Sequence, residues 1–298
     1  MSKINTNINA LTATNALTKN SRDMQLTMQR LSTGQRINGA SDDAAGITIA
    51  TTMTAQINGL NAAIKNANDG ISMLQTADGA LSETSSMLQR MRELAVLSVN
   101  DTYSATQKTA MNTEYGQLHS EIDRIALQTQ WNGMTLLTGS GGLNTPASNS
   151  VGQFTFQVGA NNAQVVSVAI LNMAITSGGN ATGGNLTPAT SMLGGLSTAS
   201  TIATAALAAT AITALDVALT NLNTQRSTIG ATVNRLTRAV DNLTNVAQNT
   251  SDSRSKIEDT DYATATSDLA RQQIIAQAAT AILAQANQQP QYVLSLLK

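Results

Sequence analysis

Few residues of this chain have the type and spacing that catalysis or metal binding requires. His119 is the only histidine, and its spacing to Glu121 and Asp123 is not that of a metal-binding motif. The chain has no cysteine, which excludes disulfides and thiolate metal sites. The adjacent carboxylates Asp42 and Asp43 are interpreted as helix-start charges, which complement the positive end of a helix dipole. The sequence therefore predicts no catalytic site, no metal site and no cofactor.

The composition favours a protein that associates with itself. Only 12% of the 298 residues are charged, about half the usual share, and the formal net charge is −1. A nearly neutral chain is a poor match for nucleic acid or an anionic membrane. Weak electrostatic repulsion between copies leaves self-association unopposed.

Targeting signals are also missing from the sequence. No run of about 18 apolar residues is present, so we expect no membrane span. Residues 1–17 lack a basic region followed by an apolar core, so we expect no cleavable signal peptide. A secreted protein of this kind would need a dedicated export route.

The chain is helical at both ends and broken in the middle. Residues 1–130 and 200–298 are predicted to be helical almost throughout, whereas residues 139–195 hold 11 of the 20 glycines and two of the three prolines. This mirrored order predicts that the two ends pair and that the middle forms the far tip. The expected fold class is mostly α, with long antiparallel coiled-coil-like helices folded back on themselves and a small β-hairpin region in the middle of the chain.

The first and last helices carry weak apolar stripes. The first is expected over about 5–32, with Gly34 as its C-terminal stop, and the last over about 261–289, where Pro290 interrupts it. Helices this rich in Ala, Thr, Asn and Gln bury little apolar area, so we expect both ends to be disordered in the monomer and to order on association. The residues predicted to carry this assembly are Ile4, Ile8, Leu11, Ile275, Ile282, Leu296 and Leu297.

The two long inner helices have stronger heptad repeats, which predict coiled-coil-like seams. One is expected over about 43–99 with Leu60, Leu74, Leu81 and Leu88 in its seam, and the other over about 198–253 with Leu215, Leu222, Ile229, Leu236 and Leu243. Gly59, Gly70 and Gly79 each cost the first of these helices about 1 kcal/mol relative to Ala. Close packing of a neighbouring backbone is the expected compensation.

Shorter signals complete the predicted layout. Ser104 and Gln107 fit a capping box for a third helix, and Trp131-Asn132-Gly133 indicates a tight turn. Alternation of apolar and polar residues over 154–158 and 166–170 predicts a hairpin with its turn at 159–163. Residues 176–196 are rich in Gly, Thr and Ser and are expected to form a flexible loop.

Several long motifs resemble the signatures of bacterial flagellin. They are LSTGQRINGASDDAAG (31–46), LQRMRELAV (88–96), FTFQVGAN (154–161), KIEDTDYA (256–263) and AQANQQPQYVLSLLK (284–298). The resemblance implies a structural subunit that polymerises head-to-tail into an extracellular flagellar filament. It also implies an inner domain from 1–42 plus 255–298, a helical domain with a hairpin from 43–175 plus 196–254, and a surface loop at 176–195 in place of outer domains.

The resemblance also implies partners. These are other copies of the chain, flagellar cap and hook-associated proteins, and an export chaperone at the C-terminal helix. Gln89, Arg90, Leu94 and Glu114 match positions that Toll-like receptor 5 contacts in related flagellins, and ordinary subunit packing is the alternative role of these residues. Arg90 and Leu94 lie one helical turn apart, so we expect them to share a face.

Two other functions remain open at this point. A hook–filament junction protein has similar terminal helices but caps growth in few copies. An adhesin or a flagellin-borne enzyme would need a large middle domain or clustered catalytic residues, and the sequence has neither.

Overall fold

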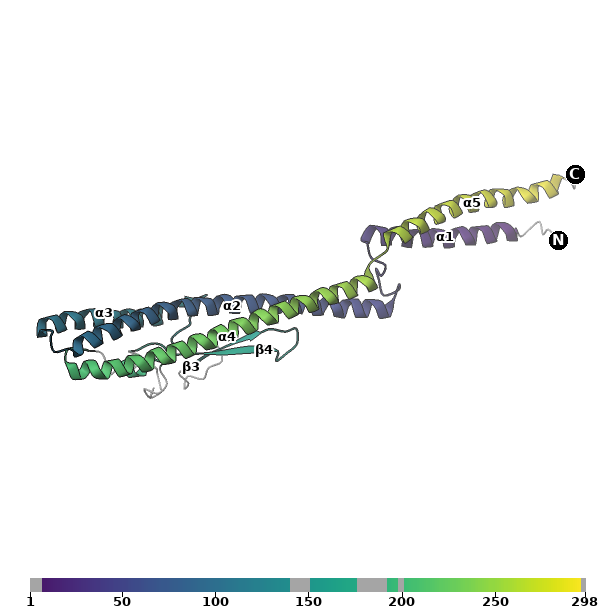
Figure 1. Cartoon of the computed structure of the whole chain (residues 1–298). Helices are drawn as coiled ribbons and strands as arrows, with labels where there is room; N and C mark the ends of the chain where they lie inside the picture. Colours follow the sequence, from purple (N-terminus) through teal and green to yellow (C-terminus); the bar gives the residue numbers. More distant parts are fainter. Residues whose placement is uncertain (1–6, 140–150, 176–191, 198–200, 296–298) are drawn as a thin grey trace. The chain divides into compact units, whose positions relative to one another are not determined.

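The computed structural model describes residues 7–139, 151–175, 192–197 and 201–295. The chain divides into two compact units (Figure 1): a terminal unit of Met1–Ile57 with Ala247–Lys298, and a central unit of Asn58–Val246. The helices α2 (Ala44–Val99) and α4 (Ala205–Glu258) contribute residues to both. The division thus falls inside two continuous helices, whereas the predicted domain ends at 42 and 255 follow the helix breaks. A helix can change packing partners without a break in its backbone.

The terminal unit contains the helix pair α1 (Ile8–Thr33) and α5 (Tyr262–Ser295), which run antiparallel side by side (Figure 1). Gly34 ends α1 with a φ of 73°, a left-handed conformation that glycine adopts without strain, and its N–H bonds to the Arg30 carbonyl. The predicted interruption at Pro290 is wrong, because α5 continues to Ser295. A proline removes one backbone hydrogen bond, and the bonds of the turns on either side can carry the helix past it.

A short bridge joins the two helix breaks of the terminal unit. The Arg36 N–H donates to the Glu258 carbonyl at 2.6 Å, and the Thr260 N–H donates to the Gly34 carbonyl at 2.9 Å. The helix pair continues the same antiparallel alignment. Asn20 donates to the Gln272 carbonyl at 2.9 Å, and Asn7 donates to the Ala286 carbonyl at 2.8 Å. The predicted pairing of the two ends is therefore present as a backbone bridge followed by a helix pair.

The central unit is built on α2, α3 (Ala105–Gln128) and α4, which enclose its apolar core. The expected mostly α fold with long helices is confirmed. The predicted capping box is present at α3, where Ser104 accepts from the Gln107 N–H and the Gln107 side chain accepts from the Ser104 N–H. All the predicted seam residues of α2 and α4 are at most 8% exposed: Leu60, Leu74, Leu81, Leu88, Leu215, Leu222, Ile229, Leu236 and Leu243.

The predicted hairpin consists of β3 (Val151–Gln157) and β4 (Val165–Leu171), which pair antiparallel with Phe154 opposite Val168. Val166, Val168 and Ile170 alternate into the core, as the period of two requires. A smaller pair, β1 (Gln130–Trp131) and β2 (Met134–Thr135), is joined through Asn132 and Gly133, both at positive φ. This is the tight turn that the Asn-Gly sequence predicts.

Of the three α2 glycines for which close packing was expected, two accommodate this hairpin. A Cβ at Gly59 would lie 3.1 Å from the Cβ of Ala160, and one at Gly70 would lie 2.8 Å from the Phe156 ring. At Gly79 nothing lies within 4 Å of an added Cβ. Close packing therefore explains Gly59 and Gly70, and the structure gives no packing reason for Gly79.

One helix side chain and one backbone hydrogen bond hold the chain on the two sides of residues 176–191. The buried Asp123 accepts a hydrogen bond from the Ile175 N–H at 2.6 Å, and the Met192 N–H donates to the Asn172 carbonyl at 2.8 Å. Met192 and Leu193 are buried and precede the 3-10 turn η2 (Gly194–Ser197). The predicted surface loop of 176–195 is therefore wrong at its end, because 192–193 belong to the core; residues 176–191 lie outside the described part.

Among the described helices, α4 alone is long and apolar enough to cross a membrane by length and composition, with a mean hydropathy of 1.5 over 18 residues. Abundant alanine raises this mean although no continuous apolar run is present, which is why the sequence reading missed it. Buried residues of the helix, such as Ala208, Ala211 and Leu215, belong to the apolar core of the central unit. A core helix meets the same criterion of length and hydropathy.

Candidate functional site

The terminal helix pair exposes most of its largest apolar side chains. Ile8 and Leu11 of α1 are 57% and 59% exposed, and Ile275 and Ile282 of α5 are 46% and 60% exposed. Ile274, which the sequence reading did not select, is 67% exposed. The other predicted assembly residues, Ile4, Leu296 and Leu297, lie outside the described residues.

The seam between α1 and α5 is lined by small and polar residues instead. The buried residues of α1 are Ala13, Asn20 and Thr27, which are spaced by seven. In α5 the half-buried Gln272 and the buried Ala286 lie on the facing side. The predicted single apolar stripe of α1 is therefore divided: Leu17, Met24 and Leu31 are half-buried, whereas Ile8, Leu11 and Met28 are exposed.

The second candidate surface lies on α2 and α3 of the central unit. Arg90 donates to Glu114 of α3 at 2.8 Å and to Glu93 of α2 at 2.7 Å. These two carboxylates raise the pKa of Arg90 above its ordinary value, mainly through the hydrogen bond to Glu114. The guanidinium is thus held on the surface by groups on two helices.

Leu94 does not belong to this surface. Its side chain is only 2% exposed and packs in the core, whereas the Arg90 side chain is 45% exposed. Arg90 and Leu94 lie one turn apart, but a step of four residues also turns the helix by about 40°, and Leu94 is on the core side of this face. Gln89, Arg90 and Glu114 remain as the exposed members of the predicted set.

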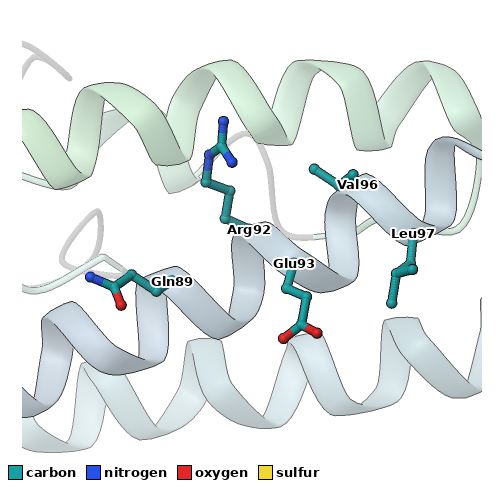
Figure 2. Close-up of a pocket in the computed structure, with 5 residues that line it drawn as sticks. All are labelled: Gln89, Arg92, Glu93, Val96 and Leu97. Carbon is teal, nitrogen blue, oxygen red and sulfur yellow. The ribbon is translucent and has the colours of Figure 1, made fainter.

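A shallow groove of about 390 Å³ adjoins these residues on α2. It is lined by Gln89, Arg92, Glu93, Val96 and Leu97, and Val96 is 48% exposed. Figure 2 shows Arg92 extending toward α4, while Glu93 and Leu97 point to the opposite side of α2. Arg92 forms an ion pair with Asp216 of α4 at 2.6 Å. The sequence reading missed Arg92 and Val96, although an exposed valine beside charged residues in a heptad helix is a signal of an open face.

Metal-ligating side chains do not gather into clusters among the described residues. Groups of three or more His, Asp or Glu side chains that could hold a metal ion are absent from these residues. Groups of this kind are not formed by His119, which is half-buried and whose Nε2 is buried without a hydrogen-bond partner among the described residues.

Comparison with known proteins identifies the family of this chain. Residues 4–141 match the bacterial flagellin N-terminal helical region, and residues 212–297 match the bacterial flagellin C-terminal helical region. The chain is 39% identical over 303 residues to flagellin of Bacillus subtilis, covering 99% of this chain and all of the relative. It is also 39% identical over 297 residues to the flagellar filament 33 kDa core protein of Treponema phagedenis, covering 99% of each.

A solved structure shares the fold at lower identity. A protein described as flagellar hook-associated, from Vibrio parahaemolyticus, aligns with a TM-score of 0.57 and 15% identity, covering 73% of this chain and all of that one. At this identity the likeness concerns the fold alone. The full-length relatives carry the assignment, and none of the comparisons favours the hook–filament junction function over the filament subunit. The chain belongs to the bacterial flagellin family, in a short form, and is a structural subunit of the extracellular flagellar filament.

Proposed function

We propose that the terminal helix pair completes its folding only when the subunit joins the filament. The observation that carries this proposal is the arrangement of α1 and α5, whose isoleucines and Leu11 face outward while Asn20 and Thr27 lie between the helices. An isolated pair with this arrangement gains little from its own seam. Neighbouring copies are the partners that would cover the exposed isoleucines.

The free-energy balance supports this dependence on neighbours. Ordering one residue costs about 1–2 kcal/mol of backbone entropy. A buried side chain the size of Leu or Ile returns about 1.5–3 kcal/mol, and alanine returns much less. The α1–α5 seam buries mostly Ala, Asn and Thr, so the pair alone does not offset its ordering cost. Contacts with other copies supply the missing burial, as in other cases of coupled folding and binding.

A filament requires association through two different surfaces on each copy. A two-fold contact would close after two subunits, whereas a head-to-tail contact continues indefinitely. The exposed faces of α1 and α5 and the groove at Arg92 and Val96 are candidates for such surfaces. We assign them to subunit packing.

Hydrogen exchange of monomer and seeded polymer tests the coupled folding. We expect residues 8–33 and 262–288 to exchange rapidly in the monomer and to be strongly protected in the polymer. The core helices around Leu81 and Leu222 serve as the internal reference, because they should be protected in both forms. Equal protection of the two ends from hydrogen exchange in monomer and polymer would contradict the proposal.

We further propose that the exposed surface of Gln89, Arg90 and Glu114 is read by Toll-like receptor 5 in the monomer. Replacement of Arg90 by Asp places a third carboxylate beside Glu93 and Glu114, and we expect it to weaken both receptor signalling and motility. Arg124→Asp is the matched control, since Arg124 is an exposed arginine of α3 paired with Glu121. Unchanged signalling by Arg90→Asp would remove the receptor from this proposal.

The other proposed partners are those that the family resemblance implies. We propose that α5 is held by an export chaperone before secretion, because its exposed Ile274, Ile275 and Ile282 would otherwise associate in the cytoplasm. Flagellar cap and hook-associated proteins are the proposed contacts at the ends of the polymer. We expect the chaperone to co-purify with the unchanged chain and with the Leu11→Ser control. It should no longer co-purify with the double variant Ile274→Ser with Ile282→Ser.

A further inference from the structure

The α1–α5 seam contains polar groups where a stable helix pair has leucines. Asn20 is 8% exposed, and its Nδ2 donates to the Gln272 carbonyl at 2.9 Å. That carbonyl lies inside α5, where a backbone N–H four residues later also uses it. The Asn20 side chain therefore shares a carbonyl that already accepts a hydrogen bond within α5. The shared bond stabilises the pair by little compared with the free-energy cost of burying the Asn20 amide.

The opposite side of the seam is less well satisfied. The Gln272 Oε1 is buried and has no hydrogen-bond partner among the described residues, and the same is true of the Arg30 Nε. A buried polar atom without a partner keeps its full desolvation cost. Of the three such side-chain atoms in the described part of the chain, these two belong to α1 and α5 and the third is the His119 Nε2.

The same heptad spacing is filled differently in the central unit. Most positions seven apart in the seams of α2 and α4 hold leucine or isoleucine, as at Leu74, Leu81 and Leu222, and these side chains are fully buried. In α1 the equivalent repeat is Ala13, Asn20 and Thr27. A single buried Asn in a coiled-coil seam is known to lower stability while it specifies the pairing. The two seams are therefore of different strength although their periodicity is the same.

We propose that Asn20 and Gln272 keep the terminal pair too unstable to fold in the monomer, so that folding waits for neighbouring subunits. This inference rests on the proposed coupling of folding to polymerisation and names the residues that enforce it. The polar seam lowers the stability of the pair by a fixed amount in every copy. Burial of Ile8, Leu11, Ile275 and Ile282 against other subunits then decides whether the pair is folded.

Filling the seam tests this role. In the full-length double variant Asn20→Leu with Gln272→Leu, both sites gain an apolar side chain and the unpartnered Oε1 is removed. We expect hydrogen exchange of residues 8–33 in the monomer to slow at least tenfold relative to the unchanged protein. The matched control is Asn15→Leu with Gln273→Leu, which makes the same replacements at two exposed positions of the same helices. The control monomer should exchange at the unchanged rate.

The outcomes separate this inference from the proposal beneath it. If the ends of the unchanged monomer are already protected, the coupled-folding proposal fails. If they are unprotected in the monomer and protected in the polymer, but the filled-seam variant exchanges as fast as the control, only the present inference is overturned.

A milder variant covers the case in which two leucines cause aggregation. Gln272→Ala removes the unpartnered oxygen without adding apolar surface to the exposed face. We expect it to slow exchange of the α5 segment severalfold in the monomer while the core helices keep their protection. No slowing by Gln272→Ala, in a monomer that remains dispersed, would also overturn the inference.

Discussion

The two helical regions of this chain share a seven-residue spacing but fill it with different side chains. In the central unit the repeat is occupied by Leu and Ile, and the seam forms a dry core around Leu74, Leu81 and Leu222. In the terminal pair the most buried repeat of α1 is Ala13, Asn20 and Thr27, whereas Leu17, Met24 and Leu31 are only half-buried and Ile8, Leu11, Ile275 and Ile282 are exposed. Periodicity thus decides which face of a helix packs, whereas side-chain volume and polarity decide how strongly. This difference is the basis of the proposal that contacts with other copies complete the folding of the terminal pair.

The largest expected contrast comes from removing a leucine from each seam. Leu81→Ala empties a fully buried site in the central unit, and we expect it to lower the free energy of unfolding by between about 2 and 5 kcal/mol. Leu17→Ala shortens a half-buried residue of α1 and should leave denaturant unfolding of the monomer unchanged. Urea titration followed by circular dichroism measures both. A comparable loss for Leu17→Ala would mean that the terminal pair already contributes to monomer stability.

Alkaline pH should act on the central unit through Tyr115. Burial raises the pKa of Tyr115 to about 12, compared with about 10 in the unfolded chain. The neutral phenol is therefore favoured by folding, and the stability is fully present below pH 10 and lost as the pH rises toward 12. The loss should reach about 2 kcal/mol. The measurement is the free energy of unfolding of the monomer at pH 9 and at pH 12. In the Tyr115→Phe variant this difference between the two pH values should disappear.

Two glycines of α2 separate close packing from helix propensity. Gly70→Ala directs a Cβ into the Phe156 ring, and we expect a net destabilisation of about 1 kcal/mol as the hairpin is displaced. Gly79→Ala meets open space and should stabilise the same helix by about 0.5–1 kcal/mol. Thermal unfolding of the two monomers should shift in opposite directions. Shifts of the same sign would show that Gly70 is not a packing site.

Acid pH should act on the terminal pair through Asp261, with the smallest effect. Its carboxylate accepts from the Thr264 hydroxyl at 2.7 Å and from the Ala263 N–H at 2.9 Å, and these bonds lower the pKa of Asp261. The carboxylate thus stabilises the start of α5 above its ordinary pKa near 4, and this contribution is lost as the pH falls through the lower folded value. In polymers titrated with acid, Asp261→Asn should weaken the pH dependence of α5 unfolding. An identical acid profile would exclude Asp261 as a contributor.

Much of this fold follows from local sequence signals. The capping box at Ser104, the glycine stop at Gly34 and the Asn-Gly turn each depend on a few neighbouring residues, and each is found where it was expected. The heptad seams of the long helices were also predictable, because strong Leu repeats have a single way to be buried. These signals need no knowledge of the partner element.

The candidate surfaces were less predictable because they depend on what covers each face. The sequence shows that Ile8 and Leu11 are apolar, but it does not show that α5 packs on the neighbouring face with Asn20. Leu94 was assigned to a surface because it matches a receptor-contact position of related flagellins, but its side chain lies on the core side of α2. Residues at the edge of a stripe are ambiguous in this way until the partner helices are placed.

The hydrogen bonds around Asn172 and Asp123 have a consequence for how this chain tolerates change. The hydrogen bond between Met192 and Asn172 holds the backbone on the two sides of residues 176–191 side by side. Ile175 also bonds to the buried Asp123, which fixes this part of the backbone to the core. Loop-closure entropy rises only slowly with length, so added sequence between these anchors costs little once the ends are fixed. A foreign domain whose own termini lie close together could be inserted there without disturbing the helices. The chain therefore contains a ready insertion point for evolution and for engineering, at which a filament-forming scaffold can acquire a new outer surface.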